Sequence, residues 1–510
     1  MFDKRSSGIL LHPSSLPGRF SIGTLGKNAR LFIDFLAETG QKWWQILPLG
    51  PVSFGNSPYQ CFSAFAGNPL LIDPEEFIDK EWIAKDDITI IDTPTDKVDF
   101  ECAKEVQLPI LYKVFEGFLR NASKNEISDY RKFLDENGWW LNDYALFMAC
   151  KKHNNDLPWN LWDQKLIERD PATLIYSKRT YNEDYERNRF IQYLFFKQWL
   201  DLKRYANQKD ILIIGDLPLY VSYDSSDVWA NQDLFFLDEK HEPTLVGGVP
   251  PDYFSETGQL WGNPVYNWEE LSLRNYDWWI ARLHFNIRLF DRIRIDHFRG
   301  LEAFWAIPAT ADTAVDGSWM KAKGLELLSM FQRQIGAMPI LAEDLGLITP
   351  EVIELRNKFD LPGMKVLQFA FGSDGINEHL PQNYTPDFVA YTGTHDNDTS
   401  EGWYEKLKKK EKHRAIQYLL SNDKQISHKM MRTVWASTAR VAIAPLQDVL
   451  GLDSDARMNT PGTVGNNWEW RFQQDELNDQ HRDFLKHITL LYNRSEIKEN
   501  TDYMTEQEEG

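Results

Sequence analysis

The feature of this sequence that most limits its fold is a series of short apolar runs, several of which end at a polar or charged residue. The runs are residues 8–12, 43–49, 211–216, 292–296, 339–343, 366–371, 388–392 and 441–445. Buried parallel strands have this pattern, because helices cover both faces while functional side chains gather at the carboxyl ends. Eight such runs predict a closed (β/α)8 barrel, with a doubly wound open sheet as the alternative.

Helical patterns separate these runs, as βα units require. Residues 29–40 predict one helix, ended by Gly40. A second helix precedes the 292–296 run, and Asn275 and Asp277 at its start suit a cap and a dipole-favoured acid. Its apolar residues, spaced three and four apart, are Trp279, Leu283, Ile287 and Phe290.

The runs are unevenly spaced, which predicts insertions within one catalytic domain of residues 1–510. We expect residues 73–205 to form an inserted, mainly helical subdomain. Residues 222–275 are rich in Pro, Gly, Asn and Trp, so we expect them to form long loops over the barrel mouth. The Glu-rich segment 497–510 is predicted to be a disordered acidic tail.

The charge balance argues against two classes of partner. The 56 Lys and Arg residues face 76 Asp and Glu residues, giving a net charge of -20. Nucleic acids and anionic membranes both select clustered basic residues, so neither is an expected partner. A neutral ligand is the natural candidate. The 19 Trp and 20 Tyr residues either all belong to a large aromatic core or, in part, line a groove for such a ligand.

The cysteines and the N-terminal segment predict a cytoplasmic protein. Cys61, Cys102 and Cys150 are an odd number without metal-like spacing, so no disulfide framework is expected. No signal-peptide core and no apolar run of about 20 residues is found. We expect a monomer or small homo-oligomer.

Four carboxylates stand at the ends of predicted strands. Asp216, Asp296 and Glu343 each close a run, and Asp396 follows another after three residues. The carboxyl ends of barrel strands open onto one mouth, so we expect all four side chains to converge. Crowding like charges is costly, and the two common reasons are a divalent metal such as Mg²⁺ and glycosidic chemistry with one nucleophilic and one acidic carboxyl group.

Neighbouring residues favour the glycosidic interpretation. Arg294 lies two residues before Asp296, so on a strand both side chains point the same way, and the cation favours the carboxylate form that a nucleophile needs. His297 and His395 flank the acids and are candidates for bonds to ligand hydroxyls, with a purely structural role as the alternative.

Strand alternation does not decide which member of the Glu343–Asp344 pair points inward. Glu343 is preferred because its longer side chain reaches a scissile oxygen more easily.

Three segments of this chain resemble those of the amylomaltases, or disproportionating enzymes, a family of 4-α-glucanotransferases. They are residues 292–300 (RIRIDHFRG), 342–346 (AEDLG) and 393–397 (GTHDN). Further similar segments occur in the family's order, at residues 55–60, 214–218, 248–252, 258–264, 458–462 and 466–471. The resemblance covers nearly the whole chain from Ser7 to Arg471.

The resemblance implies a retaining 4-α-glucanotransferase without a cofactor and without a C-terminal β-sandwich, acting on α-1,4-glucans and maltooligosaccharides. It implies that Asp296 is the nucleophile, Glu343 the acid and base, and Asp396 the stabiliser of the transition state. The implied substrate-binding residues are Ser57, Tyr59, Asp216, Gln259, Trp261, Arg294, His297, His395 and Asn467. Gln259 and Trp261 match a loop on the acceptor side, and Asn467 matches a glucan-binding loop.

Three alternatives stay open from the residues themselves. An α-amylase-like hydrolase would use the same three acids and would raise the number of reducing ends. A metal-dependent barrel enzyme would lose activity on chelation. A non-catalytic glucan-binding protein would bind without turnover.

Overall fold

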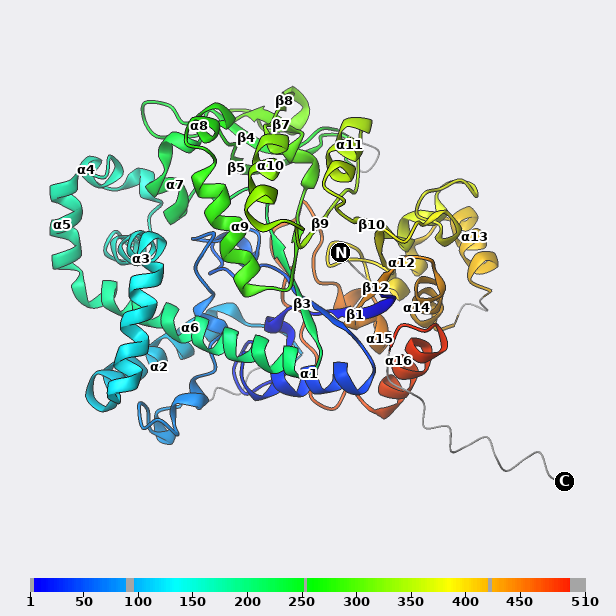
Figure 1. Ribbon diagram of the computed structural model, residues 1–510, viewed down its shortest axis with the longest axis horizontal. Helices are drawn as coiled ribbons and strands as arrows, with labels where there is room; N and C mark the ends of the chain where they lie inside the picture. The colour runs from blue at the N-terminus through cyan, green and yellow to red at the C-terminus, as the bar shows by residue number, and fades with distance from the viewer. Residues whose placement is uncertain (1–3, 89–95, 252–254, 421–423, 496–510) are drawn as a thin grey trace.

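Eight parallel strands form a nearly closed barrel in the computed structural model, which describes residues 4–88, 96–251, 255–420 and 424–495 (Figure 1). The strands are β1 (Ser6–Leu10), β2 (Trp43–Gln45), β3 (Leu212–Leu217), β6 (Arg292–Ile295), β9 (Ile340–Ala342), β10 (Gly363–Val366), β11 (Phe388–Tyr391) and β12 (Val441–Pro445). They neighbour one another in the order β10-β11-β12-β1-β2-β3-β6-β9. The Ala342 N–H donates to the Pro362 carbonyl at 2.9 Å and links β9 to the start of β10. Chain order is kept around the ring, so the barrel is confirmed over the doubly wound sheet.

Each of the eight apolar runs overlaps a barrel strand, but the prediction that residues 366–371 form one is wrong over most of its length. The strand is Gly363–Val366, and Leu367–Phe371 is a 3-10 turn. Leu367 and Ala370, three residues apart, are buried, while Phe369 between them is 38% exposed. An apolar period of three fits a 3-10 turn, and a five-residue apolar run does not reveal that period.

Sixteen α-helices lie in the described residues. They are α1 (Lys27–Glu38), α2 (Phe100–Asn121), α3 (Lys124–His153), α4 (Gln164–Ile167), α5 (Pro171–Thr180), α6 (Asn182–Gln208), α7 (Ser226–Ala230), α8 (Trp268–Leu273), α9 (Asp277–Leu289), α10 (Gly324–Ile335), α11 (Pro350–Lys358), α12 (Ser400–Lys406), α13 (Lys409–Leu419), α14 (Ile426–Ala436), α15 (Leu446–Leu450) and α16 (Asp479–Leu491). Helix α1 ends just before Gly40, as expected. Helix α9 begins at Asp277, but its N-cap is Tyr276 in a left-handed conformation, so the predicted cap by Asn275 is wrong.

Helices α2, α3 and α6 lie together on one side of the barrel (Figure 1). Aromatic rings fill the space between them, as in the contact of Trp140 on α3 with Phe196 on α6 at 5.8 Å between centroids. Helix α6 also anchors the loop after β2, because Gln192 and Gln198 each bond both the N–H and the carbonyl of one residue, Gly67 and Asp73. That residues 73–205 form a subdomain with those boundaries stays a prediction.

A second sheet of four antiparallel strands lies at one edge of the barrel (Figure 1). It contains β4 (Leu245–Val249), β5 (Gln259–Pro264), β7 (Ala303–Pro308) and β8 (Ser318–Lys321), in the order β5-β4-β7-β8. Two of these strands come from the 222–275 region, for which only loops were predicted. Its high Gly and Pro content conceals them, since these residues normally interrupt strands.

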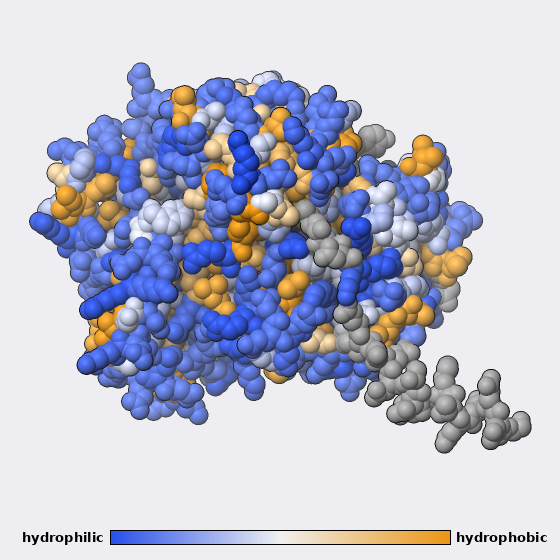
Figure 2. Space-filling view, viewed as in Figure 1, coloured by the Kyte–Doolittle hydropathy of each residue, from blue (hydrophilic) through white to orange (hydrophobic). Residues whose placement is uncertain are grey.

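The surface of the molecule is mostly polar and its core is rich in aromatic residues. Figure 2 shows a face that is mostly hydrophilic, with apolar residues in small scattered groups. Several tryptophans, among them Trp44, Trp199 and Trp435, are fully buried. None of the helices in the described ranges combines the length and apolar character needed to cross a bilayer. The predicted tail, 497–510, lies outside the described residues.

Candidate active site

Asp216 and Arg294 occupy facing positions on two neighbouring strands. Strands β3 and β6 pair in register, with Asp216 opposite Arg294. Gly215 lets the adjoining helix pack closely, because a Cβ there would lie 2.2 Å from the Phe290 ring. Both charged side chains are almost completely buried, and Arg294 Nη1 donates to Asp216 Oδ2 at 2.6 Å. The register of the barrel therefore creates a buried ion pair at its mouth.

Arg294 also holds Asp296. Its Nη2 donates to Asp296 Oδ1 at 2.8 Å, so one guanidinium joins two carboxylates. The Asp296 side chain is 28% exposed, unlike that of Asp216. Burial and Asp296 raise the pKa of Asp216 to about 6, while Arg294 opposes that rise. Asp296 is thus the member of this group that a ligand in the mouth can reach, with Oδ1 directed by Arg294.

The backbone after Asp296 turns sharply. His297 has φ 49° and ψ 50°, a left-handed conformation that costs a residue other than glycine roughly 1–3 kcal/mol. This turn aims the His297 N–H at Glu343 Oε2, at 2.7 Å. The imidazole contacts Trp261 edge to face, with 4.9 Å between ring centroids, and burial lowers its pKa to about 4. His297 therefore contributes its backbone N–H to Glu343, and its neutral ring packs against Trp261.

Glu343 follows β9 and is bound to the segment that carries Asp296. Its Oε1 accepts from the Leu345 N–H at 2.9 Å, and its Oε2 accepts from the His297 N–H. Backbone bonds add to this, since the Glu343 N–H donates to Ile295 and its carbonyl accepts from Phe298. Burial, reinforced by Asp296, raises the pKa of Glu343 to about 8, while Arg294 and the two amides limit the rise. A carboxyl group with this pKa holds a proton at neutral pH.

Asp344 points away from the barrel mouth. It forms an ion pair with Arg356 on α11 and accepts from the Met364 N–H at 2.7 Å. The inward side chain of the pair is therefore Glu343. Strand alternation alone did not decide between Glu343 and Asp344, and the contacts of Asp344 do.

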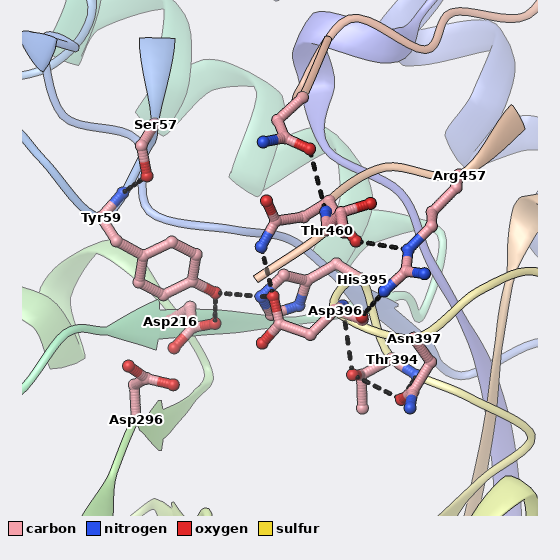
Figure 3. Close-up of polar contacts among 12 residues, drawn as sticks. Ser57, Tyr59, Asp216, Asp296, Thr394, His395, Asp396, Asn397, Arg457 and Thr460 are labelled. Carbon is pink, nitrogen blue, oxygen red and sulfur yellow. Dashed lines mark hydrogen bonds and ion pairs between the residues drawn. The ribbon is translucent and has the colours of Figure 1, made fainter. Parts of the chain in front are cut away.

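Tyr59 crosses the mouth from the loop after β2 (Figure 3). Its hydroxyl donates to Asp216 Oδ2 at 2.7 Å and lies 2.9 Å from His395 Nε2, with the two rings stacked. Ser57 accepts from the Tyr59 N–H at 3.2 Å and so shapes this loop. Tyr59 and His395 thus form one wall of the site, continuous with the Asp216–Arg294 pair.

Asp396 faces the site from the turn after β11 (Figure 3). Its side chain is 44% exposed, and its Oδ1 lies 3.4 Å from His395 Nε2. Asn459 Nδ2 donates to the same oxygen at 2.6 Å, and Arg457 Nη2 donates to the Asp396 carbonyl at 2.7 Å. Neither Asn459 nor Arg457 was singled out from the sequence. The only sequence signal for them is their place in, or next to, the similar segment 458–462.

Asn467 lies at the base of the loop that follows Asn459. Its Oδ1 accepts from the Thr460 N–H at 2.9 Å, and its Nδ2 donates to the Thr463 carbonyl at 3.1 Å. Trp468, the next residue, contacts both Tyr59 and His395, with centroid distances of 5.8 and 5.9 Å. The structure thus places Asn467 inside the loop. It also brings Trp468, which the sequence indicated only as a member of the similar segment 466–471, to the wall of the site.

Gln259 and Trp261 lie on β5 of the second sheet. Trp261 Nε1 donates to Gln259 Oε1 at 3.1 Å, and both side chains are half-buried. Trp261 also lies near Tyr220, with 6.2 Å between centroids. The predicted site residues therefore gather around one mouth, although Ser57, Gln259 and Asn467 reach it through their neighbours.

This arrangement suits chemistry with one ionised and one protonated carboxyl group. Asp296 is tied to a cation and open to the mouth, whereas Glu343 is buried with a raised pKa. Glycoside cleavage needs one carboxyl group that holds a proton for the leaving oxygen and one that is open to the sugar, and these two environments supply them. Within the described residues no three His, Cys, Asp or Glu side chains are grouped so as to hold a metal ion.

Comparison with known proteins finds relatives that match nearly the whole chain. A family model described as 4-alpha-glucanotransferase matches residues 11–477. Proteins of that name from Thermus thermophilus and a Synechocystis species are each 47% identical, over 94% and 97% of this chain and 96% and 99% of their own lengths. The solved amylomaltase from Streptococcus agalactiae, in complex with acarbose, shares 42% identity and a TM-score of 0.94, covering 96% of this chain and all of that one. The similarity extends beyond the strand ends to the inserted helices and the second sheet.

Proposed function

Since this chain belongs to the 4-α-glucanotransferase family, we propose that Asp296 is its nucleophile, Glu343 its acid and base, and Asp396 the stabiliser of its transition state. The enzyme moves a segment of an α-1,4-glucan to the 4-hydroxyl of an acceptor glucan or glucose, through a covalent glucosyl-enzyme on an aspartate. The observation that carries the residue assignment is the bonding of Glu343 to the backbone of the segment that holds Asp296.

In the first step, Asp296 attacks the anomeric carbon while Glu343 protonates the departing 4-oxygen. Arg294 holds Oδ1 of Asp296, which leaves Oδ2 to form the bond. A retaining enzyme requires its two carboxyl groups about 5–5.5 Å apart, so that no water fits between nucleophile and sugar. The Asp216, Tyr59 and His395 group provides hydrogen bonds for the hydroxyls of the sugar at the cleavage point.

In the second step, Glu343 removes the proton of the acceptor hydroxyl. Burial still raises the pKa of Glu343, but Asp296 is then an ester without charge, so its own contribution to that rise is lost. Arg294 and the His297 and Leu345 amides then favour the ionised form. The same residue therefore changes from acid to base between the steps, as a retaining mechanism requires.

We assign binding of the acceptor sugar to Gln259 and Trp261. We assign a further glucan-binding wall to the loop that Asn467 orders. An acceptor sugar stacked on Trp261 would occupy the place of water, and aromatic rings suit the apolar faces of sugars. Transfer is favoured over hydrolysis when the acceptor binds well and water is excluded.

Incubation with maltotriose, without added metal, tests this function directly. We expect glucose and a ladder of longer maltooligosaccharides at a constant number of reducing ends. Glucose and maltose with rising reducing ends would instead establish a hydrolase. No turnover would contradict the assignment, and chelation, metal addition and binding assays would then separate a metal-dependent enzyme from a binding protein.

Replacing Asn459 by alanine should lower kcat about 10- to 100-fold, because a hydrogen bond to a charged group contributes about 1.5–3 kcal/mol. Initial rates of maltotriose disproportionation measure this loss. The control is the same substitution in an Asp396→Asn background, where little further loss is expected if Asn459 acts through Asp396. A full additional loss there would assign Asn459 a separate role.

We also propose a cytoplasmic setting, which the three free thiols of Cys61, Cys102 and Cys150 support. A monomer or small homo-oligomer stays a prediction, which light scattering after size exclusion would measure.

A further inference from the structure

Arg299 stands one turn beyond the proposed nucleophile, and its contacts lie outside the sugar-binding wall. It belongs to the 3-10 turn Phe298–Leu301, three residues after Asp296. Its side chain is buried, and its Nη1 donates to the carbonyl of Leu347. Leu347 lies in the loop that follows β9 and carries Glu343. Arg299 therefore ties the segment after the nucleophile to the far end of the acid/base loop.

The face of the Arg299 guanidinium is covered by the second sheet. The Trp319 ring of β8 lies over it, with 3.7 Å between the guanidinium carbon and the ring centroid. Trp319 is in turn paired with Trp305 of β7 in the sheet register, and their rings meet edge to face at 5.2 Å. Trp319 remains 40% exposed. Arg299 is thus held between a tryptophan of the second sheet and the loop that carries Glu343.

The turn that Arg299 anchors contains the amide that binds Glu343. Leu345 donates to Glu343 Oε1, and Gly346 then adopts φ 85°, a conformation that glycine accepts without strain. Leu347 presents its carbonyl directly after this turn, although its side chain is 55% exposed. No other side-chain donor to the loop carbonyls of residues 345–348 occurs among the described contacts. The Arg299 bond therefore holds the loop two residues beyond the Leu345 N–H, while the Leu345 and Ile348 side chains pack against the core.

We infer that Arg299, stacked on Trp319, is a positioning residue that fixes the Leu345 amide on Glu343 and so sets the proton affinity of the acid/base group. The inference rests on the proposed role of Glu343. The other charges that face Glu343 are Arg294 and Asp296, with Asp216 beyond Arg294. On its own loop Asp344 is neutralised by Arg356, and Lys365 of β10 lies on that same side.

The direction of the effect follows from which protonation state the amide favours. A backbone N–H bonded to a carboxylate stabilises the ionised form and lowers its pKa. Losing the Leu345 bond should therefore raise the pKa of Glu343 further. Since the first step needs Glu343 protonated, the alkaline limb of the kcat/KM profile should move to higher pH.

The test compares Arg299→Met and Trp319→Ala with Arg5→Met, using pH profiles of kcat/KM for maltotriose together with thermal unfolding. We expect the alkaline limb to move up by about one pH unit in Arg299→Met. A shift of that size corresponds to the loss of one hydrogen bond to a charged group. Trp319→Ala keeps the charge and the donor but removes the covering ring, and should move the limb by about half a unit in the same direction. Arg299→Lys should lie between Arg299→Met and the wild type.

Arg5 is the matched control, because its guanidinium donates to the carbonyls of Trp435, Ser437 and Tyr492 at the opposite end of the barrel. Arg5→Met should lower the unfolding temperature without moving the limb. The inference is overturned if Arg299→Met lowers stability without moving the alkaline limb. It is also overturned if Trp319→Ala leaves the limb in place, because any shift in Arg299→Met would then come from the lost charge and not from the position of the loop. Normal turnover in Glu343→Gln would instead overturn the acid/base assignment, and the inference with it.

Discussion

Replacing Asp296 by alanine should abolish glucan transfer while leaving glucan binding largely intact. The loss in kcat should be on the order of 10⁶-fold, as is typical when a covalent nucleophile is removed. Binding should survive because the neighbouring wall does not depend on Asp296. Arg294 keeps its bond to Asp216, and Tyr59 and His395 keep theirs. The measurements are the turnover of maltotriose and the affinity for acarbose by calorimetry.

The matched control for this prediction is Asp344→Ala, which removes a neighbouring carboxylate that points away from the mouth. This variant should lose stability, because Arg356 is left without its partner, while any folded fraction keeps activity. Near-wild-type turnover in Asp296→Ala would refute the nucleophile assignment. Loss of both binding and turnover in that variant would indicate a collapsed site and would call for Asp296→Asn, which keeps the shape of the side chain.

The barrel was predictable because its strands are buried on both faces. Most of the runs are nearly continuous in apolar residues, and those that end at Asp216, Asp296 and Glu343 stop at the barrel mouth, so the sequence marks where these strands and their functional ends lie. Asp216 and Arg294 show this most clearly, since strand register places them side by side. The wrong strand prediction at residues 366–371 has the same cause, because an apolar run indicates that residues are buried but not which backbone conformation they adopt.

The second sheet could not be found in the same way. Its strands show no strict alternation of buried and exposed residues, and Gly247 and Gly248 remove much of the side-chain signal of β4. Gly248 is required by close packing, because a Cβ would lie 2.2 Å from the Gln259 carbonyl oxygen. A residue chosen for the absence of a side chain leaves no hydrophobic period to read. The same sheet supplies Trp261 to the mouth and Trp319 to Arg299.

The part of the site that sequence reasoning missed is held by long-range bonds. Asn459 and Arg457 contact Asp396 across more than 60 residues of chain. An asparagine before a turn is usually a turn residue, so its type and local pattern give no indication of a distant carboxylate. Only the fold, which brings the loop after β12 against the turn after β11, makes the contact.

Replacing Glu343 by glutamine should lower kcat/KM for maltotriose about 10²- to 10⁴-fold, because the leaving oxygen is no longer protonated. Maltosyl fluoride needs no such proton, so its fluoride release in a first turnover should be nearly normal. The covalent intermediate should then accumulate, because no base remains to activate an acceptor hydroxyl. Azide needs no base, and adding it should restore turnover and yield a glycosyl azide. Slow fluoride release without azide rescue would contradict the acid/base assignment.

The pH dependence gives the same prediction an independent test. In the wild type, Glu343 must be protonated in the free enzyme, and burial raises its pKa to about 8. Activity on maltotriose should therefore be present below that pH and fall as pH rises through it. Fluoride release should lack this alkaline limb in both the wild type and Glu343→Gln. An alkaline limb for maltotriose that persists in Glu343→Gln would have to come from another group, and Glu343 would then not be the acid.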